Sequence, residues 1–123
     1  MALENWSTQI KKGYLELCVL SVIRTHKCVY GFQLIRLLEE YSIPIKEGTL
    51  YPMLNRMSKD KVLKATWETK DIKGHPRKFY SLMRNGEHLL ERMQIEFAQM
   101  YKNYVKISFG AEHEQPRVRK LSS

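Results

Sequence analysis

The sequence predicts a mainly α-helical protein with one small β-hairpin. Most apolar residues recur at steps of three and four, which is typical of helices that bury one face. One stretch near the middle of the chain instead alternates apolar and polar residues, as a strand does, and a glycine- and proline-containing turn separates it from a second short run rich in aromatic residues. At 123 residues, the chain can form one small domain with an extension.

The charge balance narrows the choice of partner. The formal net charge is +8 and the isoelectric point is about 9.6, which favours a polyanion such as nucleic acid or an acidic membrane surface. No apolar run approaches the roughly 20 residues needed to cross a bilayer, and the N-terminus lacks the apolar core of a signal peptide. We therefore expect a soluble, cytoplasmic protein.

The cysteines fit that compartment as reduced thiols. Cys18 lies in a strongly apolar run, and we expect both it and Cys28 to be free and buried or half-buried. His26 lies near Cys28, but no pair of ligands has the spacing of a zinc site. We expect neither a metal nor another cofactor.

Three helices are expected before residue 42. Leu3–Lys12 has a narrow apolar stripe, Tyr14–Thr25 is apolar on most sides, and Gly31–Tyr41 is amphipathic. The first of them needs a partner for its stripe, and the second is the core helix. Its Glu16 is expected to be a solvated or paired carboxylate.

A further helix should start near Glu47. Pro44 opposes a helix through the connection, whereas Pro52 falls in or near the first turn, where a missing N–H costs least. The apolar residues Leu50, Leu54 and Met57 form an inward face, which leaves an outward set of Thr49, Tyr51, Pro52, Asn55 and Arg56. With Lys46 at a helix N-terminus that attracts phosphate, this is a candidate contact face for a polyanion. The alternative is the ordinary polar face of a surface helix.

The two strands of the predicted hairpin are Val62–Lys70 and Arg77–Met83. Leu63, Ala65 and Trp67 alternate with polar residues along the first strand. The tip and return strand carry the basic set Lys70, Lys73, His75, Arg77 and Lys78. Basic hairpin tips reach phosphate backbones or minor grooves, although a solvated loop is the simpler alternative.

The remaining chain predicts one long helix, Arg84–Phe109, with an apolar stripe. At ~1.5 Å per residue it reaches about 39 Å, which is more than a small domain can cover. We expect its far half to pack on a second copy. The tail, Gly110–Ser123, has no periodicity and is expected to be disordered. The chain thus divides into a DNA-binding region over 1–83, a dimerisation helix over 84–109 and a tail over 110–123.

Helices followed by a basic-faced helix and a basic hairpin describe a winged helix-turn-helix. The chain resembles the PadR family of transcriptional regulators, of the compact type with a single C-terminal helix. The resemblance lies in Lys-Gly-Tyr-Leu-Glu-Leu at 12–17, Tyr-Gly-Phe at 30–32, Glu-Gly-Thr-Leu-Tyr-Pro-Met-Leu at 47–54 and Gly-His-Pro-Arg-Lys-Phe-Tyr at 74–80. The chain departs from the family where Asp60 and Lys61 replace a usual glycine, so another residue must take any left-handed position there. It departs again at Ser81–Met83, where the family usually has Leu-Thr after the tyrosine.

The resemblance implies a homodimeric, DNA-binding repressor that reads a two-fold symmetric operator, with recognition helices about 34 Å apart. Thr49, Tyr51 and Pro52 match the family's groove-facing positions. Further along the helix, Asn55 and Arg56 are candidates for base contacts. The phosphate-binding candidates are Lys46 beside the helix and Lys73, His75, Arg77 and Lys78 in the hairpin.

The resemblance also implies that some members release DNA when a small aromatic or drug-like molecule binds between the subunits. The candidate ligand-binding residues are Trp6, Met93, Phe97, Met100, Tyr101 and Tyr104. The alternative is that these residues only form the dimer core.

Two other classes of function are alternatives. A winged helix can instead be a protein-interaction module whose basic wing meets an acidic partner. An enzyme has little support, because no serine or cysteine nucleophile lies near a base and no glycine-rich phosphate loop is present.

Overall fold

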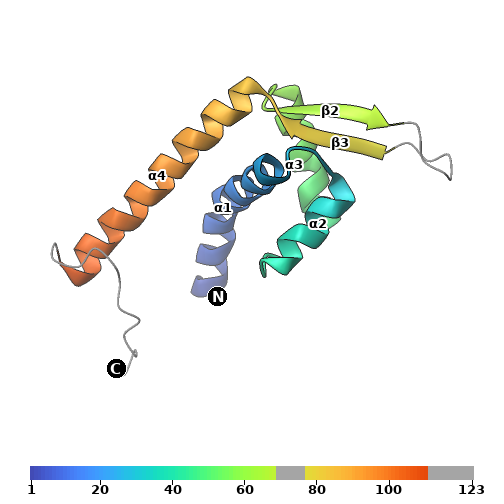
Figure 1. Ribbon diagram of the computed structural model, residues 1–123. Helices are drawn as coiled ribbons and strands as arrows, with labels where there is room; N and C mark the ends of the chain where they lie inside the picture. The colour runs from blue at the N-terminus through green and yellow to red at the C-terminus, as the bar shows by residue number, and fades with distance from the viewer. Residues whose placement is uncertain (69–76, 111–123) are drawn as a thin grey trace. The chain divides into compact units, whose positions relative to one another are not determined.

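The computed structural model describes residues 1–68 and 77–110, and in this part of the chain it has four helices and three strands (Figure 1). In chain order the elements are α1 (Ala2–His26), β1 (Val29–Tyr30), α2 (Gly31–Glu40), α3 (Glu47–Lys59), β2 (Leu63–Glu68), β3 (Arg77–Leu82) and α4 (Arg84–Phe109). The architecture confirms the predicted fold class. None of the described helices is long and apolar enough to cross a membrane.

The first helix corrects the prediction of two separate helices. Residues 2–26 form one continuous helix that passes through Gly13. A glycine in a helix interior destabilises the helix by about 1 kcal/mol relative to alanine, which is too little to interrupt a helix with long flanking segments. Only the second half of α1 enters the core. Leu3, Trp6 and Ile10, the predicted apolar stripe, are exposed.

The core lies between the second half of α1, α2, α3 and the sheet. Its fully buried side chains include Leu20, Ile23, Leu34, Leu38, Leu50, Leu54 and Leu63. The predicted inward face of α3 is confirmed, because Leu50, Leu54 and Met57 are all buried. Met53, which the prediction left out, is buried with them. Packing this face inward leaves the opposite side of α3 to solvent.

The sheet has the strand order β1-β3-β2, and both pairs are antiparallel. The prediction treated residues 26–30 as a connection, but Val29 pairs with Tyr80 and Tyr30 with Phe79. A two-residue strand has no periodicity of its own, so only this pairing defines it. The β2–β3 register runs from Leu63 opposite Leu82 to Glu68 opposite Arg77.

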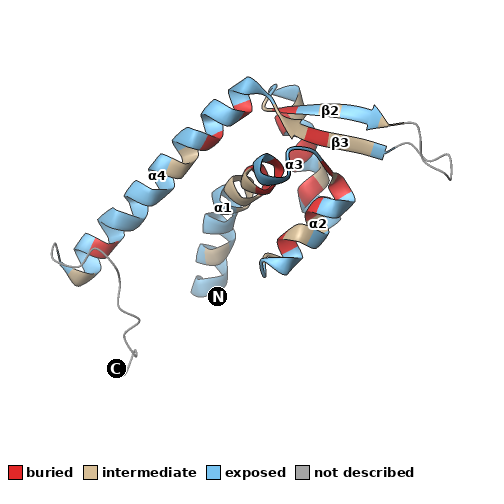
Figure 2. Cartoon of the chain, viewed as in Figure 1, coloured by how far each residue is buried: buried red, intermediate tan, exposed pale blue. Residues whose placement is uncertain are grey.

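Burial falls along β2 towards the hairpin loop. Leu63 is buried, Ala65 is half-buried and Trp67 is 60% exposed. In Figure 2, β3 is exposed at its outer end, Arg77, buried at Tyr80 and half-buried elsewhere. The alternation seen in the sequence therefore does not bury Trp67, because the outer part of the hairpin leaves the core.

The turn after α3 shows which residue takes the left-handed position where the family usually has glycine. Lys61 has φ 60°, so it occupies the left-handed region in which the family usually has glycine. The turn is closed by the Val62 N–H, which donates to the Met57 carbonyl at 2.9 Å. The Val62 carbonyl in turn accepts from the Met83 N–H at 3.0 Å. This second bond ties the turn to the start of α4.

Contacts divide the chain into two compact units, Met1–Leu90 and the part from Glu91 onward. The helix α4 has the predicted bounds and runs from the first unit into the second. Its exposed large apolar side chains are Leu89, Ile95, Phe97, Met100, Tyr101, Tyr104 and Ile107. The predicted tail lies, after Gly110, outside the described residues.

Candidate nucleic-acid interface

The predicted contact face of α3 is exposed. Thr49, Pro52 and Asn55 are exposed on the helix itself, and Lys46 is exposed at its N-cap position. No side chain caps this helix end by hydrogen bonding. The positive end of the helix dipole is therefore open to an anion, which fits the predicted role in phosphate binding.

Tyr51 is half-buried and packs on the start of α2. A Cβ atom added to Gly31 would lie 2.7 Å from Cε1 of Tyr51 and 3.1 Å from its hydroxyl. Only a residue without a side chain lets the ring approach so closely. The backbone of α2 thus orients the phenol of Tyr51 on α3.

Arg56 has a second role that the sequence did not reveal. Its guanidinium forms an ion pair with the carboxylate of Glu16 on α1, although the Arg56 side chain stays 54% exposed. The structure thus supports the reading of Glu16 as a paired carboxylate. It also turns one predicted base-contacting residue towards the protein.

The hairpin contributes cations where it leaves the core. Cζ of Arg77 lies 5.0 Å from the ring centroid of Tyr30, and Nζ of Lys78 lies 5.3 Å from that of Trp67. Both rings carry a cation at the distance of a cation–π contact. Lys70, Lys73 and His75 lie outside the described residues.

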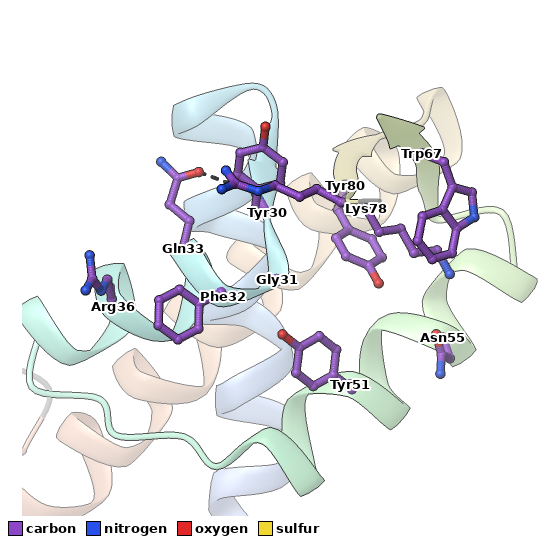
Figure 3. Close-up of a pocket in the computed structure, with 11 residues that line it drawn as sticks. Tyr30, Gly31, Phe32, Gln33, Arg36, Tyr51, Asn55, Trp67, Lys78 and Tyr80 are labelled. Atoms are coloured by element: carbon purple, nitrogen blue, oxygen red, sulfur yellow. Dashed lines mark hydrogen bonds between the residues drawn. The ribbon is translucent and has the colours of Figure 1, made fainter. Parts of the chain in front are cut away.

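An open cleft of about 850 Å³ is lined by residues of α2, α3 and the hairpin. We call it the wing cleft. Its lining residues are Tyr30, Gly31, Phe32, Gln33, Arg36, Tyr51, Asn55, Trp67, Arg77, Lys78 and Tyr80. Figure 3 shows Phe32 and Arg36 of α2 on one side, Lys78 and Trp67 on the other, and Tyr51 between them. The structure therefore brings four predicted contact residues, Tyr51, Asn55, Arg77 and Lys78, to one surface.

The sequence did not single out the other seven lining residues as contacts, and Phe32, Arg36 and Trp67 are among them. Arg36 is one of the polar residues of the amphipathic stretch Gly31–Tyr41, and Phe32 is part of the Tyr-Gly-Phe motif at 30–32. A large ring at an exposed helix start is the one local signal that could have drawn attention to Phe32.

The cysteine prediction is only partly right. Cys18 is half-buried, but Cys28 is exposed, because it follows the end of α1 rather than lying within it. Burial raises the pKa of the Cys18 thiol, and a hydrogen bond with Tyr14 offsets part of that rise. Among the described residues no three His, Cys, Asp or Glu side chains group as metal ligands.

The predicted ligand-binding residues lie on two helices. Trp6 on α1 is 59% exposed, and the others lie on α4. Within α4 the ring centroids of Tyr101 and Tyr104 are 6.4 Å apart. A ligand site built from these residues stays a prediction.

Helices α1 to α3 followed by a strand pair with a basic return strand form a winged helix-turn-helix, a fold that is common among DNA-binding proteins. The family model described as "Transcriptional regulator PadR-like family" matches residues 19–92. The chain therefore belongs to this family of DNA-binding transcriptional regulators, which confirms the resemblance seen in the sequence. Members of the family are regulators and not enzymes, in agreement with the prediction.

Solved structures agree with this assignment. A PadR-like transcription factor from Bacteroides fragilis is 31% identical, with a TM-score of 0.73 over 85% of this chain and 99% of that one. A PadR family regulator from Eggerthella lenta is 25% identical, with a TM-score of 0.76 over 86% and 91% of the two chains. A PadR-like regulator from Bacillus cereus is 30% identical, with a TM-score of 0.69 over 83% and 98%. No curated protein compared with the chain matches it.

Proposed function

We propose that the protein is a homodimeric repressor that binds a palindromic operator in the cytoplasm. The recognition helix α3 enters the major groove, and the hairpin binds the neighbouring backbone. The observation that carries the proposal is that Tyr51 and Asn55 of α3 line the same cleft as Arg77 and Lys78 of β3. A groove-reading helix and a phosphate-binding hairpin must share one face if both are to contact one duplex.

The dimer is supported by the apolar side chains of α4. Ile95 is 69% and Ile107 is 86% exposed in the single chain, and Met100 and Tyr104 are each more than half exposed. Large apolar surfaces of this kind mark protein–protein contacts. In this proposal residues 1–83 bind DNA and α4, residues 84–109, holds the two copies together.

A small aromatic molecule between the subunits is the proposed signal for release. Trp6 and the aromatic residues of α4 supply the flat rings that such a ligand needs. In a Trp67→Phe variant, the remaining Trp6 fluorescence reports on this site. Saturable quenching by an aromatic ligand that also releases DNA supports the proposal. Residues that only form the dimer core leave the fluorescence unchanged.

The main experiment is selection of bound duplexes from a random pool by the purified protein. A palindrome with half-sites about ten base pairs apart is expected. Enrichment of no sequence, with weak and salt-steep binding to all duplexes, would instead favour the protein-interaction module. Expression of a reporter placed behind the selected site then separates a repressor from an activator.

Two variants divide the interface. Lys78→Ala should weaken binding to every sequence about equally and reduce the slope of log K against log salt by about one. Tyr51→Ala should reduce affinity for the operator more than affinity for random duplex. Lys12→Ala, an equal loss of charge on the exposed first half of α1, is the control and should change neither property.

A further inference from the structure

The wing cleft carries two exposed aromatic rings on opposite walls, each with its own cation. On the α2 wall, Cζ of Arg36 lies 5.1 Å from the ring centroid of Phe32. On the hairpin wall, Nζ of Lys78 lies 5.3 Å from the ring centroid of Trp67. Phe32 is 57% and Trp67 is 60% exposed, so neither ring contributes to the core. Figure 3 shows the two pairs facing each other across the cleft.

The cleft is also strongly cationic. Arg36, Arg77 and Lys78 line it, and no carboxylate does so among the residues that the structure describes. The carboxylate of Glu68, at the end of β2, accepts a hydrogen bond from the Tyr30 hydroxyl at 3.1 Å. Clefts lined by one sign of charge concentrate their field on an oppositely charged ligand.

The spacing of the two walls is set by the fold. Tyr30 pairs with Phe79 in the sheet, and their ring centroids are 3.7 Å apart. The helix that carries Phe32 begins at the next residue, Gly31. The α2 wall is therefore fastened to β3, and β3 pairs Lys78 with Trp67 of β2. The cleft is therefore preformed in the absence of a ligand.

We infer that the wing cleft holds the sugar–phosphate backbone of one DNA strand, with Phe32 and Trp67 against the deoxyriboses and Arg36 and Lys78 on the phosphates. This chemistry suits an extended polyanion with apolar sugar faces. Tyr51 and Asn55 of α3 line the same cleft, so the strand held there borders the groove that α3 enters. The inference rests on the proposed function and adds Phe32, Arg36 and Trp67 to the DNA contacts.

Single variants of the full chain test the walls by fluorescence anisotropy with labelled duplexes. Trp67→Ala and Phe32→Ala should each weaken binding about five- to tenfold, and equally for operator and random duplex, because backbone contacts carry no sequence information. Their salt slopes should not change. Arg36→Ala should reduce the slope by about one.

The controls are matched to the residues tested. Tyr41→Ala removes an aromatic ring that is 63% exposed just after the other end of α2, and it should bind DNA like the unmodified protein. Lys12→Ala is the control for Arg36→Ala. Thermal unfolding should be the same for all variants, since the side chains removed are exposed.

A direct measurement does not depend on how these variants fold. In a Trp6→Phe background Trp67 is the one tryptophan left, and saturating duplex should shift its emission to shorter wavelength as the exposed ring leaves water. Unchanged emission, or ring variants that bind DNA as Tyr41→Ala does, would overturn the inference. The proposed function would still stand if the unmodified protein binds duplex. A loss restricted to the operator would show that the rings read bases and would overturn the backbone assignment. Failure of the unmodified protein to bind any duplex would reject both proposals.

Discussion

The carboxylate of Glu16 on α1 and the guanidinium of Arg56 on α3 form an ion pair that links the core helix to the recognition helix. Arg56 follows Asn55, which lines the wing cleft, by one residue. The pair therefore neutralises a cation next to the proposed DNA surface. Glu16, which precedes Arg56 by 40 positions, therefore determines whether the Arg56 guanidinium is available to bind DNA.

Removing the carboxylate should free Arg56. Glu16→Gln keeps the size of the side chain, and we expect it to tighten duplex binding two- to fivefold and to raise the salt slope by up to about one. Because the pair is partly exposed, the free energy of unfolding should change by less than about 1 kcal/mol. Arg56→Ala should change affinity less than twofold. A large loss in Arg56→Ala with no gain in Glu16→Gln would show that Arg56 reaches DNA while paired.

Gly31→Ala should act through Tyr51. The new methyl group would lie 2.7 Å from Cε1 of Tyr51, and rotation of that ring is the easiest relief. We expect DNA binding to fall about tenfold, as in Tyr51→Ala, with little change in thermal unfolding, because alanine suits a helix start. In a Tyr51→Ala background the same change should have no further effect. An additional loss in that background would mean that Gly31 acts on DNA independently of the phenol.

Gly86→Ala should destabilise the fold. A Cβ atom there would lie 2.2 Å from the Val62 carbonyl oxygen and 3.1 Å from Cδ2 of Leu82. That carbonyl accepts the Met83 N–H, so it cannot move away freely. We expect a loss of about 3 kcal/mol in the free energy of unfolding, measured by urea denaturation.

Gly13→Ala is the matched control for that change. Nothing lies within 4 Å of a Cβ atom at Gly13, which is inside α1. Alanine should therefore raise the free energy of unfolding by about 0.5–1 kcal/mol. Equal effects of the two substitutions would contradict the close packing of α4 on the turn after α3.

The two thiols should react at different rates. Cys28 is exposed, whereas Cys18 is half-buried and burial raises its pKa. A raised pKa keeps the Cys18 thiol protonated at pH 8, and the thiolate is the reactive form. Iodoacetamide should therefore alkylate Cys28 at least about tenfold faster, and Cys28→Ser should leave only the slow reaction. Faster loss of the thiol in Cys28→Ser than in Cys18→Ser would refute this order.

The same shift gives the direction of a pH effect on stability. The folded state holds the Cys18 proton more tightly than the unfolded state. The resulting stabilisation of the folded state is fully present below the pKa of the unfolded thiol. It is lost as the pH rises through the higher pKa of the folded state. Cys18→Ser should flatten the decline in the free energy of unfolding above about pH 9, measured by urea denaturation. An unchanged alkaline decline would assign it to other groups, such as Tyr80, whose pKa burial also raises.

The local elements could be predicted from the sequence because their signals are local. The start of α3 at Glu47 follows from the placement of Pro44 and Pro52, and the extent of α4 follows from apolar spacing within one helix. The missing glycine before β2 indicated that another residue must take a left-handed position, and Lys61 does so. Motifs within these elements were sufficient to indicate the family.

The tertiary structure alone decided how distant residues meet. The strand β1 exists only through its pairing with β3, and Arg56 meets Glu16 only because the tertiary fold brings these two side chains together. The exposure of Trp67 depends on where the hairpin leaves the core, which period-two alternation does not encode. The wing cleft joins Phe32 to Trp67 through the sheet. Periodicity reports which face of an element is apolar, but long-range packing determines which other element that face meets.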